Sequence, residues 1–274
     1  MLAAVLHATW HLLVKQTEQR QLFTGWVLAV AAVMYSPLLL LFAPLQRWVW
    51  LYAVISAIVQ ATYFILLVHA YEHADFSFAY PIARGAAPAF LCLWGVVLLG
   101  ERVSIIGLVG IACLLTGLVV VGVRFRRRVA AEVRTQDLLV ALSVALCISV
   151  YSAIDGKIVK TTPVIPYLAL VTVLTGVFVS PFVFSHYSAA QTLACWRSQR
   201  GRIMLVGILP SIPYLLILRV YAISGVSYAG ALREVSIVFA AIAGRFLLGE
   251  EFGAVRIVGS LLIFTGIIVI ALAG

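Results

Sequence analysis

Residues 76–101 read FSFAYPIARGAAPAFLCLWGVVLLGE, a stretch that is apolar and long enough to cross a bilayer, yet it carries Arg84 between Pro81 and Pro88. A charge at membrane depth costs from about 3 to more than 10 kcal/mol, so it is kept where it faces a partner or a water-filled cavity. Arg84 is therefore the first candidate functional residue.

A second stretch, residues 221–250, repeats this outline and its closing Leu-Leu-Gly-Glu. It places Glu234, next to Arg233, at the position that matches Arg84. Other matching pairs are Tyr71 and Tyr221, Ser77 and Ser227, Ala79 and Ala229, Gly110 and Gly259, and Gly117 and Gly266. The chain therefore contains an internal repeat, and both copies carry charge inside an apolar helix.

The composition is that of a polytopic membrane protein. Of the 274 residues, 64% are hydrophobic and 11% charged, and the mean hydropathy is +1.13, whereas soluble domains are about 45–50% apolar and about 25% charged. The net charge of +9 does not argue for nucleic-acid binding. In a membrane protein, excess Lys and Arg residues reflect the orientation of the loops and their contact with anionic headgroups of the lipid bilayer. The four cysteines lack metal-like spacing, and no cofactor is predicted. No Walker-A pattern or G-x-S-x-G elbow occurs, which speaks against an ATP-driven pump and a serine hydrolase.

Ten apolar segments predict an all-α membrane protein with ten transmembrane helices. They are residues 1–14, 23–43, 48–68, 76–99, 103–123, 138–155, 164–184, 203–223, 226–248 and 254–273. The densely charged linker 124–137, RFRRRVAAEVRTQD, separates a first five-helix repeat, 1–123, from a second, 138–274. Because five is odd, the second repeat enters the membrane in the opposite sense, which is the inverted-repeat plan of many secondary transporters.

These features together resemble the EamA-type branch of the drug/metabolite transporter superfamily. The resemblance rests on the ten-span plan, the repeated Leu-Leu-Gly-Glu and the closing glycine-rich helices, together with residues 7–15, 80–85 and 233–236. It implies an exporter or exchanger of amino acids and other small metabolites, driven by ion or substrate gradients. The predicted location is the cell (inner) membrane. A proton or a counter-substrate is the expected coupling partner, and the expected oligomeric state is a monomer or a homodimer.

Arg84 and Glu234 are the leading substrate-binding candidates. A guanidinium binds carboxylate or phosphate bidentately, and Glu234 could accept an ammonium group or a coupling proton, so the pair would suit a zwitterion such as an amino acid. Alternatively, the two side chains pair with each other across the repeat interface and fix the packing. Arg233 is a further candidate, or satisfies Glu234 locally.

A second set of candidates lies on the first helix of each half. His7, Trp10 and His11 share one helix face, as expected for a titratable, aromatic cavity wall or for an interfacial belt. Tyr151 and Asp155 lie near the end of the first helix of the second half. The expected partner of Asp155 is Lys157 or the headgroup region. Tyr80, near the start of a charged helix, could also hydrogen-bond substrate.

Two alternatives belong to other functional classes. His69, Glu72 and His73 match H-x-x-E-H, so a membrane-embedded metalloenzyme is one. A non-transporting, lipid-handling membrane subunit is the other.

The glycines that precede Glu101 and Glu250 are expected to end helices in the left-handed conformation, and Gly110, Gly117, Gly259 and Gly266 are expected at close helix contacts.

The orientation has two conflicting indications. Odd-numbered loops carry three times as many Lys and Arg residues as even-numbered loops, so the positive-inside rule places both termini outside the cell. The family resemblance implies that both termini are cytoplasmic.

Overall fold

The computed structural model describes residues 10, 13–42, 45–73, 76–100, 104–128, 135–226 and 254–272, and the regular structure in these ranges is helical. Its helices are α2 (Arg20–Leu41), α3 (Arg47–His73), α4 (Phe76–Leu99), α5 (Ile105–Arg128), α6 (Thr135–Ile158), α7 (Val164–Ser185), α8 (Ala189–Ile208), α9 (Ser211–Ile223) and α12 (Ala254–Leu272).

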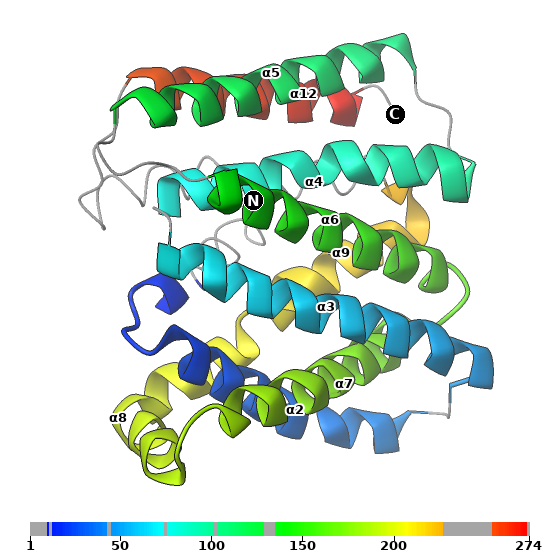
Figure 1. Cartoon of the computed structure of the whole chain (residues 1–274). Coiled ribbons are helices and arrows are strands. Elements are labelled where there is room, and N and C mark those ends of the chain that lie inside the picture. The colour runs from blue at the N-terminus through cyan, green and yellow to red at the C-terminus, as the bar shows by residue number, and fades with distance from the viewer. Residues whose placement is uncertain are drawn as a thin grey trace.

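The helices lie in a stack in which neighbours come mainly from opposite halves of the sequence (Figure 1). At one end α5 packs along α12. Next come α4, α6 and α3, each against its neighbour, and then the pair formed by α2 and α7, with α8 against α2 at the far end. The two halves of the chain are therefore interleaved, and any hollow in the middle of the stack is shared between them.

The outer surface of the stack is apolar. Large hydrophobic side chains are exposed on several helices, among them Leu40 at 89% and Ile105 at 81%, which is far more apolar surface than soluble monomers show. Among the residues that the structure describes, five segments are long and apolar enough to cross a bilayer: Arg20–Leu41, Arg47–Tyr71, Thr135–Ile158, Val164–Ser185 and Ala189–Ile223. Ile82–Val97, Ile105–Gly117 and Ile257–Ile270 are shorter apolar helices. The chain is a multi-pass, all-helical membrane protein.

Among the described residues, most helices lie within a few residues of the predicted spans, and the eighth segment differs; α5 and α6 also extend into the predicted linker 124–137, to Arg128 and from Thr135. The predicted segments 1–14 and 226–248 lie mostly outside the described residues. A single span was expected over 203–223, with a loop before it. The structure instead starts α8 at Ala189, where Ser188 and Gln191 form a capping box, and α8 gives way to α9 around Leu209 and Pro210. The apolar window covers only the last turns of α8, from residue 203 on, because three exposed arginines, Arg197, Arg200 and Arg202, precede them in the helix.

The glycines predicted at close contacts are confirmed between α5 and α12. A Cβ on Gly110 would lie 2.9 Å from the carbonyl oxygen of Gly266, and one on Gly117 would lie 2.7 Å from that of Gly259. Each glycine thus faces the repeat equivalent of the other, which is the reciprocal pattern of a twofold axis. The helices run antiparallel, and a side chain at these positions would meet backbone atoms of the partner helix.

The α2 and α7 pair is also held together by a close backbone approach. A Cβ on Gly176 would lie 2.5 Å from the Leu28 carbonyl oxygen, and the Ser180 hydroxyl donates to the Gly25 carbonyl oxygen at 3.0 Å. Both helices contain a Ser-Pro pair near the C-terminal end, with Pro37 in α2 and Pro181 in α7. This correspondence is a further sign of the repeat.

The turn after α4 has the predicted left-handed glycine. Gly100 has φ +67° with no atom close to a built Cβ, so backbone conformation, not space, favours glycine at this position. The four cysteines are free thiols, of which Cys92 and Cys195 are buried and Cys113 and Cys147 partly exposed.

Candidate functional site

A hollow lies between the two halves of the described chain. Its empty space is about 880 Å³, a figure that includes the part open to the outside. The first half supplies the N-terminal segment, α2 and α3, and the second half supplies α6, α7, α9 and the end of α8. Its walls are Trp10, Val14, Thr24, Val27, Leu28, Ala31, Gln60, Tyr63, Phe64, Tyr151, Thr172, Thr175, Gly207, Pro210, Ser211, Pro213 and Tyr214.

A second hollow adjoins the first and shares Thr24 and Phe64 with it. It has about 690 Å³ of empty space and reaches Gln21 and His186, at the N-terminal end of α2 and just beyond the C-terminal end of α7. These two ends lie at the same side of the antiparallel helix pair. The second hollow therefore lies between the first hollow and that side of the helix pair.

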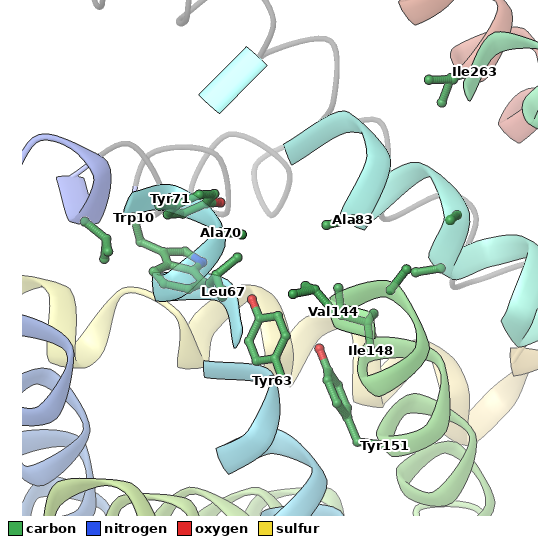
Figure 2. Packing of buried hydrophobic residues seen from close by; sticks show 14 of the residues in the cluster. Trp10, Tyr63, Leu67, Ala70, Tyr71, Ala83, Val144, Ile148, Tyr151 and Ile263 are labelled. Carbon is green, nitrogen blue, oxygen red and sulfur yellow. The ribbon is translucent and has the colours of Figure 1, made fainter. Parts of the chain in front are cut away.

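Aromatic rings form one side of the first hollow. Tyr63 of α3 and Tyr151 of α6 approach edge to face, with ring centroids 5.9 Å apart, and Tyr151 meets Tyr214 of α9 at 6.1 Å. Trp10 lies 6.1 Å from Phe64. Figure 2 shows Tyr63 and Tyr151 side by side between α3 and α6, with Trp10 packed near Leu67 and Tyr71. Rings in this arrangement offer apolar faces and, at the tyrosines, hydroxyl groups to a solute.

Two hydroxyls in the walls have no hydrogen-bond partner among the described residues. Thr24 on α2 is 4% exposed and Thr175 on α7 is 2% exposed, and the side-chain oxygen of each is buried. A buried hydroxyl left unpaired costs about 1–3 kcal/mol. Such groups therefore favour a hollow that takes up water or a polar solute able to bond them.

The most buried ionisable group near the hollow is Asp155 of α6, which is 0% exposed. Tyr167 of α7 donates to Oδ1 at 2.6 Å, the Gln60 amide of α3 donates to Oδ2 at 3.3 Å, and Tyr214 of α9 donates to Oδ2. The same Gln60 nitrogen lies 3.2 Å from the Tyr214 hydroxyl and 3.4 Å from that of Ser56. We call Asp155, Gln60, Tyr167, Tyr214 and Ser56 the Asp155 cluster.

The partners of Asp155 differ from the sequence expectation. Lys157 is exposed, and the carboxylate is enclosed by hydroxyl and amide groups within the bundle. Residues 155 and 157 point to different sides of the helix, which accounts for the difference. Among the described side chains, no cation pairs with Asp155, and its partners are neutral.

The junction of α8 and α9 forms part of the wall because of its prolines. Pro210 and Pro213 lack the N–H groups that would bond the carbonyls of Val206 and Leu209 in an uninterrupted helix. Gly207, Pro210 and Pro213 all line the hollow. Broken helices at membrane depth are tolerated where they border protein or a water-filled cavity, and in many transporters they border the substrate site.

Arg84 is buried within the bundle, with 1% exposure. It lies on α4, which continues through Pro81 and Pro88 and packs against α5 and α6. It is not among the described side chains that line the hollow.

The structure brings together only some of the predicted site residues. Trp10 and Tyr151 are in the wall of the hollow and Asp155 lies behind it. Tyr80 lies in α4, but its side chain is outside the described part. His7, His11, Arg233 and Glu234 lie outside the described residues altogether.

Sequence reasoning missed the partners of Asp155 and the two wall threonines. The sequence does give one clear signal for Gln60, since its amide stands in the middle of an otherwise apolar helix. Tyr167 and Tyr214 gave no signal, since tyrosine is also common at the ends of membrane helices.

The metalloenzyme alternative has no support in the described chain. His69 lies on α3 and is exposed, whereas the side chains of Glu72 and His73 are not described. No group of three or more potential metal ligands occurs among the residues that could be searched.

Known proteins resemble this chain in sequence and in fold. The fold defines a multi-pass membrane protein with a hollow between its halves. The family model described as the EamA-like transporter family matches residues 1–123 and 136–272. The chain therefore belongs to the EamA-like transporter family, a family of transporters of the drug/metabolite type.

Among solved structures, one crystal structure aligns with a TM-score of 0.70 at 18% sequence identity, over 99% of this chain and 94% of its own. At this identity the likeness concerns the fold alone. No curated protein matches the sequence.

Proposed function

We propose that this protein is a secondary active transporter in the cell (inner) membrane, an exporter or exchanger of small polar metabolites that works by alternating access. In this proposal ten helices form two inverted five-helix repeats that rock about the shared hollow. The observation that carries the proposal is that both halves line one hollow, beside a broken helix. The reciprocal glycine contacts of α5 and α12 support the inverted relation.

The favoured substrates are amino acids, and within them those with apolar or aromatic side chains. The described wall combines aromatic rings with uncharged hydrogen-bonding groups, namely those of Thr24, Gln60, Thr175 and the tyrosines. An apolar side chain would lie against the rings, while the polar end of the solute bonds the hydroxyls. In the sequence, Arg84 and Glu234 occupy matching positions, and we assign the carboxylate and ammonium ends of the solute to them.

Transport by purified protein in liposomes tests the proposal. Vesicles loaded with unlabelled L-phenylalanine should take up tritiated L-phenylalanine by exchange, and empty vesicles should not. Arg84→Ala should abolish exchange, whereas Arg219→Ala, which changes an exposed arginine of α9, should leave it intact. Normal exchange by Arg84→Ala would remove Arg84 from the substrate site, and the absence of exchange for any amino acid would refute the assigned substrate class.

A further inference from the structure

The Asp155 cluster contains a buried carboxylate that does not line the hollow, so the binding of a solute there does not require it. Asp155 is fully buried but is not part of the wall, whereas two of its partners, Gln60 and Tyr214, are wall residues. The cluster joins α3 of the first half to α6, α7 and α9 of the second half. It therefore connects the hollow to the packing of the two halves against each other.

The environment of Asp155 stabilises both protonation states of the carboxyl group. Three donors from Tyr167, Tyr214 and Gln60 stabilise the charged form. Complete burial with no cation among the described partners stabilises the neutral form. A group balanced in this way can gain and lose a proton without unfolding its surroundings.

The neighbouring helices bring few other titratable groups to it. From α3 the cluster receives Ser56 and Gln60, which do not titrate, and the phenols of Tyr167 and Tyr214 contact the carboxylate directly. The remaining ionisable side chains of interest on the helices packed there are Tyr151 beside Tyr214, Tyr63 beside Tyr151, Arg84 on α4, Arg219 on α9 and the exposed Lys157 on α6 itself.

We propose that the Asp155 cluster is a proton-binding site that couples proton movement to transport, with Asp155 as the proton acceptor and Tyr214 as its link to the hollow. The inference rests on the proposed transport function. Its ligand is a single proton.

The proton reaches Asp155 through the Tyr214 hydroxyl. In the charged state, Tyr214 donates its hydrogen to Oδ2 and offers only lone pairs to the hollow. On protonation, that hydrogen passes to Oδ2 and the phenol oxygen takes one proton from a hydronium ion in the hollow, which leaves as water, so that one proton enters and no charge remains on the carboxyl group. Tyr214 can then accept a bond from the Asp155 O–H and donate to a solute.

This change affects both the hollow and the interface between halves. When Asp155 is protonated, the Tyr214 hydroxyl in the wall changes from a hydrogen-bond acceptor to a donor toward the hollow. The affinity for a solute therefore depends on the protonation of Asp155. The charge-assisted bonds from Gln60 and Tyr167 become ordinary ones, so contact between α3 and the second half weakens. Both effects bias the two halves between their arrangements, which is what coupling requires.

Infrared titration of the full-length protein in lipid tests proton binding without any solute. Lowering the pH should produce the C=O absorption of a buried carboxylic acid in wild type and in Asp137→Asn, a control change at the first turn of the same helix. Asp155→Asn should lack this band, and Tyr214→Phe should keep it at a shifted frequency, because one hydrogen-bond partner is gone. Identical spectra for wild type and Asp155→Asn would overturn the proposal.

Transport in liposomes tests coupling separately. A pH gradient should change net tritiated L-phenylalanine uptake several-fold in wild type and Asp137→Asn, whereas uptake by Asp155→Asn should be the same with and without the gradient. Absence of exchange in wild type counts against the transport function, whereas the infrared result stands independently. Exchange with an unchanged gradient response in Asp155→Asn would overturn the coupling role alone.

Discussion

Gly266→Ala tests the close backbone contact between α5 and α12. A Cβ at Gly266 would lie 2.5 Å from the Leu114 backbone nitrogen and 2.6 Å from the Gly110 carbonyl oxygen. Neither atom can turn away as a flexible side chain would. To restore ordinary contact at 3.4 Å, the helices must separate by about 0.9 Å.

Overpacking of this kind costs about 1–3 kcal/mol, and each kcal/mol lowers the Tm of a chain of this size by about 2–4 °C. We therefore expect the apparent Tm of the purified protein in detergent to fall by several degrees. Gly117→Ala, at the repeat equivalent of Gly266, should give a comparable fall, because its Cβ would lie 2.7 Å from the Gly259 carbonyl oxygen.

Gly201→Ala is the matched control. Gly201 is exposed in the interior of α8, and no atom lies within 4 Å of a Cβ built there. Alanine is favoured over glycine within a helix by about 0.5–1 kcal/mol, so the apparent Tm should stay the same or rise. A Gly266→Ala protein as stable as wild type, or an equal fall for Gly201→Ala, would refute the packing argument.

Three further changes test individual contacts. Ser180→Ala removes the bond to the Gly25 carbonyl oxygen and should cost about 0.5–1 kcal/mol, seen as a small fall in apparent Tm that the exposed Ser185→Ala does not show. Trp26→Phe removes the indole bond to the Thr192 carbonyl oxygen at 2.9 Å and should loosen α8 from α2, measured as faster proteolysis within α8; unchanged cleavage would contradict this. Thr175→Val removes a buried hydroxyl without a partner in the described chain, so it should maintain or raise the apparent Tm while weakening L-phenylalanine binding in a thermal-shift titration. Unchanged binding would remove Thr175 from the site.

The sequence predicts those parts of the fold that depend on composition and repetition. Apolar segments of bilayer length give most helix bounds among the described residues, and the matched glycines predict close helix contacts, although not which helices meet. The break between α8 and α9 was missed, because apolarity persists through it while the prolines interrupt only the hydrogen bonds. The repeat boundaries at 1–123 and 138–274 stay a prediction.

The candidate site is less accessible to sequence reasoning. Charge inside an apolar segment identifies Arg84 and Asp155 directly, because ionised groups are rare at membrane depth. The hollow itself depends on which helix faces meet, and residues 60, 155, 167 and 214 come from four helices that only tertiary packing brings together. The sequence could therefore indicate the acid, but not the neutral groups around it.

The central claim is that solute passes through the hollow shared by the two halves, and a single cysteine placed in its wall tests this most directly. In a background without Cys92, Cys113, Cys147 and Cys195, Thr172→Cys would present a thiol to the hollow, and Gly201→Cys would present one on the outer surface of α8. The account predicts that a water-soluble maleimide blocks L-phenylalanine exchange by the Thr172→Cys protein, that L-phenylalanine slows this modification, and that the modified Gly201→Cys protein exchanges normally. Normal exchange by a fully modified Thr172→Cys protein would contradict it.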